Sequence, residues 1–215
     1  MKKYHDYKQM LPLVGLEKLW EEEQARHGLE SYGKTGKYLR KIDDYFPEKM
    51  QCYEAMGLNK SGPKKILDIG TGVGYFPWLC DQNGHACDYA DSDPMPFYTG
   101  AHKLLKLKGR YLNLTVKGME RFELPDSYDI ITGHRTVFDI FDYHWYLDEW
   151  RCFLGNCADY LHDDGFVFIK TNLVQGAHLH TPHPAWLKFI KPYLLDGFNS
   201  FTFKISKDQI LNDLG

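Results

Sequence analysis

The residues best suited to chemistry are glycines that recur at every second position after a short apolar segment. Gly70, Gly72 and Gly74 follow residues 66–69, and Asp68 stands shortly before the first glycine. Glycine at such a turn lets a ligand touch the bare backbone, because a side chain there would collide with it. The turn leads into a predicted helix, whose first N–H groups lack partners. The pattern predicts a ligand held by backbone at the end of a buried strand.

The same turn separates two classes of ligand. A dinucleotide-binding turn of the form G-x-G-x-x-G has glycine or alanine three positions after its second glycine, where the helix approaches a pyrophosphate. Tyr75 occupies that position, so a nicotinamide or flavin dinucleotide fits poorly. The spacing present is G-x-G-x-G with a preceding acid. This resembles the first motif of the class I S-adenosylmethionine-dependent methyltransferase family.

The resemblance covers residues 64–170 and implies further site residues. In the family, an acid ends the second strand about 20 residues beyond the glycine turn and binds the ribose hydroxyls. Asp91 matches this acid, and Asp93 is the competing position. Met119 stands where the family often has an acid that meets the adenine amino group, and we expect it to pack against the adenine ring instead. The resemblance implies a cofactor site formed by Asp68, Gly70, Thr71, Gly72, Gly74, Tyr75, Asp91, Ser92, Met119 and Gly133.

Residues after the predicted fourth strand are candidates for the methyl-acceptor site, because ligands of open α/β sheets lie beyond the carboxyl ends of the strands. Transfer to a hydroxyl requires removal of a proton, a task that suits a histidine of near-neutral pKa. His134 is the first candidate for this base and His144 the second, with Asp139 or Asp142 to orient them. Alternatively, His134 only shapes the cofactor pocket. Arg135 either holds an acidic acceptor or pairs with a neighbouring aspartate.

A second histidine-rich segment follows the predicted fifth strand. His178, His180 and His183 lie close together, a density that raises the question of a metal site. No carboxylate or cysteine falls inside the cluster. We therefore predict no metal, and leave open whether the segment contacts substrate or is a solvated loop.

The candidate site residues come together only if the strands before them end at a common edge of one sheet. Strand patterns occur at residues 66–69, 85–90, 111–116, 128–132 and 166–169, and helical patterns at residues 77–82, 95–108 and 143–161. Alternating strands and helices imply right-handed crossovers and a mostly parallel sheet. The predicted fold class is α/β, a doubly wound sheet of about six to seven strands with helices on both faces.

The two ends of the chain extend this core. We expect residues 1–60 to form an N-terminal helical cap within the same domain as the core, residues 61–215, with one helical pattern running up to Pro47. In the loop between the cap helices, Tyr32, Lys34 and Lys37 either close over the methionine part of the cofactor or are solvent-exposed. After a helix at 184–195 and a strand at 201–205, few residues remain for a seventh strand. Either the last hairpin is incomplete or a strand is misassigned.

Composition narrows the class of protein. A chain of 215 residues suits one domain, and a net charge of -3 makes nucleic acid an unfavoured partner. The 15 Tyr, 13 Phe and 5 Trp suit a pocket for a flat or sugar-like acceptor, and equally an ordinary core. The 5 Cys include no C-x-x-C pair, which favours reduced, buried thiols. No segment approaches the roughly 18 apolar residues of a membrane span, so we expect a cytoplasmic protein.

The sequence therefore predicts an enzyme that transfers a methyl group from S-adenosylmethionine to oxygen or nitrogen of a small molecule, such as a sugar or secondary metabolite. Two alternatives stay open. One is an RNA methyltransferase that uses a basic strip of Lys103, Lys106, Lys108 and Arg110. The other is a catalytically inactive cofactor-binding partner subunit. The oligomeric state is not predicted.

Overall fold

The core of the protein is a six-stranded sheet in the order β3-β2-β1-β4-β5-β6. The computed structural model describes residues 3–27, 38, 41–92, 95–135, 145–171, 184–198 and 200–214. The strands are β1 (Lys65–Ile69), β2 (Ala86–Asp91), β3 (Tyr111–Asn113), β4 (Tyr128–His134), β5 (Leu161–Lys170) and β6 (Thr202–Ser206). The first five strands pair in parallel, and β6 is antiparallel to β5. The predicted doubly wound, mostly parallel sheet is confirmed.

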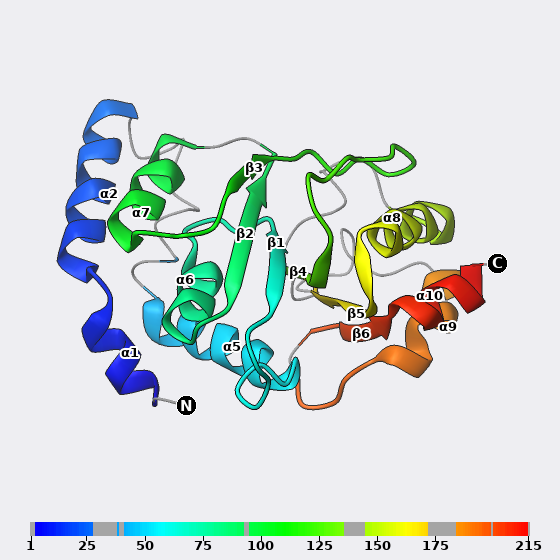
Figure 1. Ribbon diagram of the computed structural model, residues 1–215. Coiled ribbons are helices and arrows are strands. Elements are labelled where there is room, and N and C mark those ends of the chain that lie inside the picture. Colours follow the sequence, from blue (N-terminus) through cyan, green and yellow to red (C-terminus); the bar gives the residue numbers. More distant parts are fainter. Residues whose placement is uncertain are drawn as a thin grey trace.

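Helices cover both faces of this sheet. They are α1 (Tyr4–Met10), α2 (Leu13–His27), α5 (Ile42–Ala55), α6 (Tyr75–Gln82), α7 (Pro96–Leu105), α8 (Leu147–Asp159), α9 (Pro184–Ile190), the short 3-10 helix η1 (Lys191–Tyr193) and α10 (Lys207–Leu214). Figure 1 shows α1, α2, α5, α6 and α7 on one side of the sheet and α8, α9 and α10 on the other. The N-terminal helices therefore share a face with the helices that connect β1, β2 and β3.

Successive residues of the central strands supply the two cores. Ile66 and Ile130 are buried against the N-terminal helices, whereas Leu67 and Ile131 are buried on the opposite face. This alternation follows from the strand period of two. Both faces of the strands are apolar because a parallel sheet is covered by helices on each side. The strand order reverses between β1 and β4, and in such sheets ligands bind beyond the strand ends at that point.

Several element boundaries differ from the predicted ones. The fourth strand continues to His134, because its last residues pair with the end of β5. The third strand is shorter than predicted and ends at Asn113. The fifth strand begins at Leu161, earlier than the predicted start at residue 166. Pro47 lies inside α5 and does not end it.

The C-terminal end of the chain differs most. The last predicted strand pairs with β5 and closes that edge of the sheet. The residues after Ser206 form the helix α10, which packs against the opposite core through Ile210. A seventh strand does not occur among the described residues. In place of the last hairpin considered above, β6 is followed by the helix α10.

Three expectations concern the whole chain. All five cysteines are free, and Cys52, Cys80, Cys87 and Cys157 are buried. Within the described ranges, no helix has the length and apolar character needed to cross a membrane. In the same ranges, no group of three or more His, Cys, Asp or Glu side chains is arranged to hold a metal ion. The histidines at 178, 180 and 183 lie outside the described residues.

Candidate functional site

The glycine turn joins β1 to α6, and hydrogen bonds to neighbouring elements fix its position. The N–H groups of Gly70 and Thr71 donate to the carbonyl of Ala90 on β2, at 2.7 and 3.1 Å. Gly74 precedes the helix with a φ of 92°. A Cβ there would lie 2.9 Å from Leu107 Cδ1 and 3.0 Å from His102 Cδ2. Both the backbone conformation and the space therefore require glycine at this position.

His102 of α7 supports the turn from the side. Its Nε2 lies 2.7 Å from the Gly72 carbonyl, which can only accept, so the imidazole donates. Burial lowers the pKa of His102, and the hydrogen bond to Gly72 opposes this shift. The role of His102 was not predictable, because a single histidine within a helical pattern carries no signal of a contact to a distant turn.

Asp91 ends β2 beside the turn. Its Oδ2 accepts a hydrogen bond from the Gly72 N–H at 3.0 Å. Burial raises the pKa of Asp91 to about 7, with the nearby Asp68 carboxylate adding to this shift and the Gly72 hydrogen bond opposing it. Asp91, the predicted acid, thus lies next to the predicted glycines. Its carboxylate is only partly solvated.

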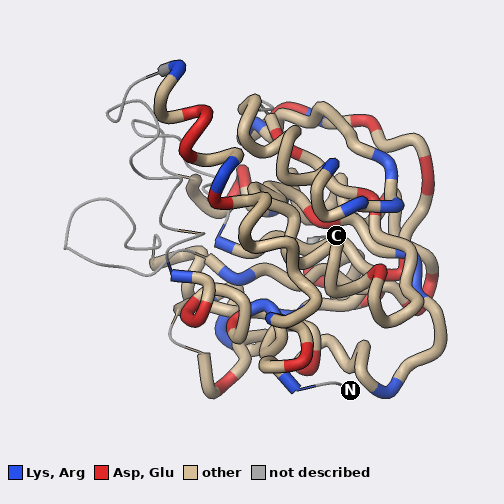
Figure 2. Tube along the Cα trace, turned by 90° about the vertical axis from the view of Figure 1, so that its left-hand side faces the viewer, with Lys and Arg blue, Asp and Glu red and all other residues tan. Residues whose placement is uncertain are grey.

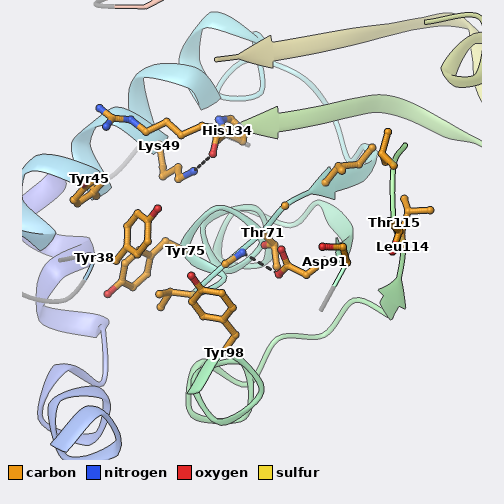
Figure 3. A pocket seen from close by; sticks show the side chains of 17 residues that line it. Tyr38, Tyr45, Lys49, Thr71, Tyr75, Asp91, Tyr98, Leu114, Thr115 and His134 are labelled. Carbon is orange, nitrogen blue, oxygen red and sulfur yellow. Dashed lines mark hydrogen bonds between the residues drawn. The ribbon is translucent and has the colours of Figure 1, made fainter. Parts of the chain in front are cut away.

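A pocket opens over these residues at the carboxyl ends of the strands (Figure 3). Its wall includes four tyrosines, Tyr38, Tyr45, Tyr75 and Tyr98, from the helical side of the site. The remaining lining residues are Lys49, Ile69, Gly70, Thr71, Gly72, Val73, Asp91, Ser92, Leu114, Thr115, Val116, His134 and Arg135. The pocket therefore combines aromatic walls, bare backbone, one carboxylate and two cations.

The pocket includes only part of the predicted cofactor site. Gly70, Thr71, Gly72, Tyr75, Asp91 and Ser92 line it, whereas Asp68, Gly74, Met119 and Gly133 are not among the lining residues. Met119 is 61% exposed, and residues 114–116 form the wall near β3 in its place. Asp93, Asp139, Asp142, His144 and the loop residues Tyr32, Lys34 and Lys37 lie outside the described residues.

Asp68 lies beneath the pocket and is buried, with 1% of its surface exposed. Burial raises its pKa to about 6, and the positive charge of Lys49 acts against that shift. Its Oδ1 lies 3.8 Å from His134 Nε2 and has no hydrogen-bond partner in the described part of the chain. Asp68 therefore contributes charge to the floor of the pocket.

His134 lines the pocket from the end of β4, but its side chain is only 1% exposed. Its Nε2 lies 3.0 Å from the Thr132 hydroxyl, and its ring packs 4.3 Å from that of Phe76. Burial, reinforced by the positive charges of Lys49 and Lys170, holds the pKa of His134 well below its usual value. An imidazole with so low a pKa is a weak proton acceptor, which argues against the predicted general base and favours a wall residue.

The helix α5 brings an unpredicted set of polar residues to the site. Arg135, with a φ of 58°, follows β4 and forms a bidentate pair with Glu48: its Nε lies 2.7 Å from Oε1, and its Nη2 contacts Oε2. The guanidinium also lies 5.2 Å from the centre of the Tyr45 ring. Arg135 thus pairs with an acid, but that acid is a glutamate and not the neighbouring aspartate considered above. Its partner comes from α5, a helix far away in the sequence.

Comparisons with known proteins bear on the fold. No protein-family model and no curated protein matches the sequence. Among solved structures, the chain is similar to TehB from Haemophilus influenzae, with 12% identity over 73% of this chain and 58% of that chain and a TM-score of 0.47. It is also similar to an S-adenosylmethionine-dependent methyltransferase from Clostridium acetobutylicum, with 15% identity over 67% and 57% of the two chains and a TM-score of 0.50.

A third solved structure is the 16S rRNA N2 G1207 methyltransferase of T. thermophilus in complex with AdoMet and guanosine, with 16% identity and a TM-score of 0.53. The match covers 76% of this chain and 43% of that one. The chain thus spans about half of the length of these proteins. At such identities the likeness shows the fold: the chain has the Rossmann-like fold of the class I S-adenosylmethionine-dependent methyltransferases.

Proposed function

We propose that the protein binds S-adenosylmethionine in this pocket and transfers the methyl group to a small-molecule acceptor. The observation that carries the proposal is the junction of Asp91 with the glycine turn, where the carboxylate accepts from the Gly72 N–H and both residues line the pocket. The fold supports the proposal, since this junction lies at the carboxyl ends of the strands, where the fold binds ligands.

The residues present fit the cofactor. The Gly72 side of the turn is open, because a Cβ there would meet only the Tyr98 ring, at 3.8 Å or more. One carboxylate oxygen of Asp91 accepts from the backbone, which leaves the other for the ribose hydroxyls. Leu114 and Val116, on the wall near β3, offer apolar contacts to the adenine ring, the role predicted for Met119.

The cofactor, when bound, supplies a methyl group on a positively charged sulfur, and the chain has to place the acceptor in line with it. The tyrosines of the pocket wall suit this positioning, because an aromatic ring offers a rigid apolar surface and a polar edge. We assign His134 to the wall. For a hydroxyl acceptor, His144 stays the predicted base, with Asp139 or Asp142 to orient it.

The charge distribution favours a small molecule over RNA. Arg110, one member of the predicted basic strip, pairs with Asp88 at 3.1 Å and also contacts Asp126. Figure 2 shows Lys and Arg interspersed with Asp and Glu over the described chain. Affinity for a phosphate backbone depends on several uncompensated cations, and Arg110 is already compensated.

Labelled cofactor tests the proposal. The protein is incubated with S-adenosylmethionine labelled in the methyl group, once with a small-molecule extract and once with total RNA. We expect label in the small-molecule products and none in the precipitated RNA. Label in RNA alone would contradict the assigned acceptor. Tight cofactor binding without transfer to either fraction would favour the inactive partner subunit.

A further inference from the structure

One cation of the pocket differs from its neighbours, because no acid among the described residues pairs with it. Lys49 is on α5, is partly buried and lines the pocket. Its Nζ lies 3.5 Å from the backbone carbonyl of His134, the contact marked by a dashed line in Figure 3. Among the described residues, no carboxylate oxygen lies within 4.0 Å of this ammonium.

The other two cations nearby are compensated by one acid. Arg135 forms the bidentate pair with Glu48, and Lys170 Nζ lies 3.9 Å from the same carboxylate and 2.8 Å from the Ser200 hydroxyl. Glu48 therefore serves two cations already. Lys49 keeps hydrogen-bond donors that its one long contact to a carbonyl does not use.

A partly buried ammonium that lacks a counter-ion is stabilised by an anionic ligand. Burial lowers the pKa of Lys49, and the Arg135 cation adds to that shift, whereas Asp68 and Glu48 oppose it. The backbone carbonyl oxygen of His134 lies beside the Lys49 ammonium, and it can accept a hydrogen bond from a ligand ammonium. This end of the pocket thus offers one group for a carboxylate and one for an amine.

The position of Lys49 along the pocket identifies the ligand group. In Figure 3, Leu114 and Thr115 lie at one end, Asp91 and Thr71 in the middle, and Lys49 with His134 at the other end. If adenine and ribose lie beside Leu114 and Asp91, as the proposed function requires, the amino-acid part of the cofactor extends toward α5. We infer that Lys49 binds the carboxylate of that amino-acid part. The sequence had pointed to Lys34 or Lys37 for this contact.

The inference rests on the proposed function, and a pair of ligands separates the two. S-Adenosylhomocysteine carries the amino-acid group, whereas 5′-methylthioadenosine shares the adenosine and the thioether and lacks that group. We expect Lys49→Met to weaken S-adenosylhomocysteine binding about tenfold or more, as for loss of a charge-assisted hydrogen bond. Binding of 5′-methylthioadenosine should change by less than about twofold, and Lys49→Arg should restore part of the loss.

Isothermal titration calorimetry of the full chain measures both ligands. Lys103→Met, at an exposed position of α7 that does not line the pocket, removes the same charge and should leave both affinities unchanged. Unchanged S-adenosylhomocysteine affinity in Lys49→Met would overturn the inference, and so would an equal loss for both ligands, which would indicate a structural role. If wild-type protein binds neither ligand, the proposed function itself fails.

Discussion

Burial partly removes the Asp91 carboxylate from water, and the positive charge of Lys49 only partly offsets this effect. The pKa of Asp91 is raised from 3.8 to about 7, so the ligand-free protein favours the protonated form only below that pH. A raised pKa of an acid means that this group contributes stability below about pH 4 and that the contribution is lost as pH rises through about 7. A functional role explains why such an acid is present at the pocket.

The first prediction is that Asp91→Asn has opposite effects on stability and binding. Asparagine can keep the bond from the Gly72 N–H without a charge, so the ligand-free variant should be more stable at pH 8 by about 1 to 3 kcal/mol, with no gain near pH 4. It should bind S-adenosylhomocysteine about tenfold or more weakly. Denaturant unfolding at both pH values and calorimetry measure the two effects. Lower stability at pH 8 would contradict this account.

The second prediction concerns His134. Because burial and two nearby cations lower its pKa, the imidazole should take up a proton only well below its ordinary value of 6.5. The ring resonances of His134, followed by NMR through a pH titration and assigned with His134→Asn, report its protonation directly. A midpoint at or above 6.5 would contradict the assignment to the wall and restore the predicted base.

Residues differ in how far the sequence reveals them. Asp91 and the glycines were predictable, because strand and turn follow each other closely and each residue type serves one chemical need. Lys49 and Arg135 meet only in the folded chain, since α5 precedes the sheet and β4 comes after it. Their partner, Glu48, gave no local signal, because a charged residue in a helical pattern is ordinarily solvent-exposed.

At the scale of elements, the turn between β1 and α6 and the helix α5 together form the pocket. The third prediction compares two glycines with similar backbone conformations. Gly74 and Gly84 have φ values of 92° and 82°, but only at Gly74 would a Cβ meet atoms within 4 Å. Gly84→Ala should therefore lower the free energy of unfolding by about 1 kcal/mol from backbone strain.

Gly74→Ala adds a clash with Leu107 and His102. We therefore expect this variant to be about 1 to 3 kcal/mol less stable than Gly84→Ala. It should also weaken S-adenosylhomocysteine binding, whereas Gly84→Ala should not. Denaturant titration and calorimetry give both comparisons. Equal losses of stability in the two variants would show that the contact with α7 does not shape the turn.

The fourth prediction tests how α5 is held to the sheet. Glu48 and Arg135 expose only 8% and 19% of their side chains, so Glu48→Gln should cost about 3 kcal/mol by leaving Arg135 and Lys170 without their shared acid. The matched control is Asp43→Asn, because Asp43 pairs with Lys8 at the surface and is 64% exposed. This control should change the unfolding midpoint little. Equal losses of stability in the two variants would show that the ion pair of Glu48 and Arg135 does not hold α5 to the sheet.

Element types were more predictable than their ends. The alternation of apolar strands and helices gave the sheet class, but Gly133 and His134 interrupt the apolar pattern and so hid the last part of β4. Pairing with Ile169 and Lys170 of β5 extends that strand, and the sequence of β4 alone does not reveal this pairing. Pro47 likewise sits within α5 because Phe46 and Cys52, on either side of it, are buried against the core.

At the scale of the whole molecule, the strand order places β1 and β4 beside each other, and the pocket opens where the order reverses. The fold was predictable because one turn, one acid and a regular alternation of strands and helices all specify the same architecture. The acceptor was not, since the same fold supports many acceptors and the residues around the pocket come from distant segments.

The most direct test of the central claim is a calorimetric titration of the full chain with S-adenosylhomocysteine beside a parallel titration with NAD. The turn at Gly70, Gly72 and Gly74, with Tyr75 after it and Asp91 beside it, predicts one-to-one binding of S-adenosylhomocysteine and none of NAD. Binding of NAD that S-adenosylhomocysteine does not displace would contradict the account, as would the absence of any heat of binding with S-adenosylhomocysteine.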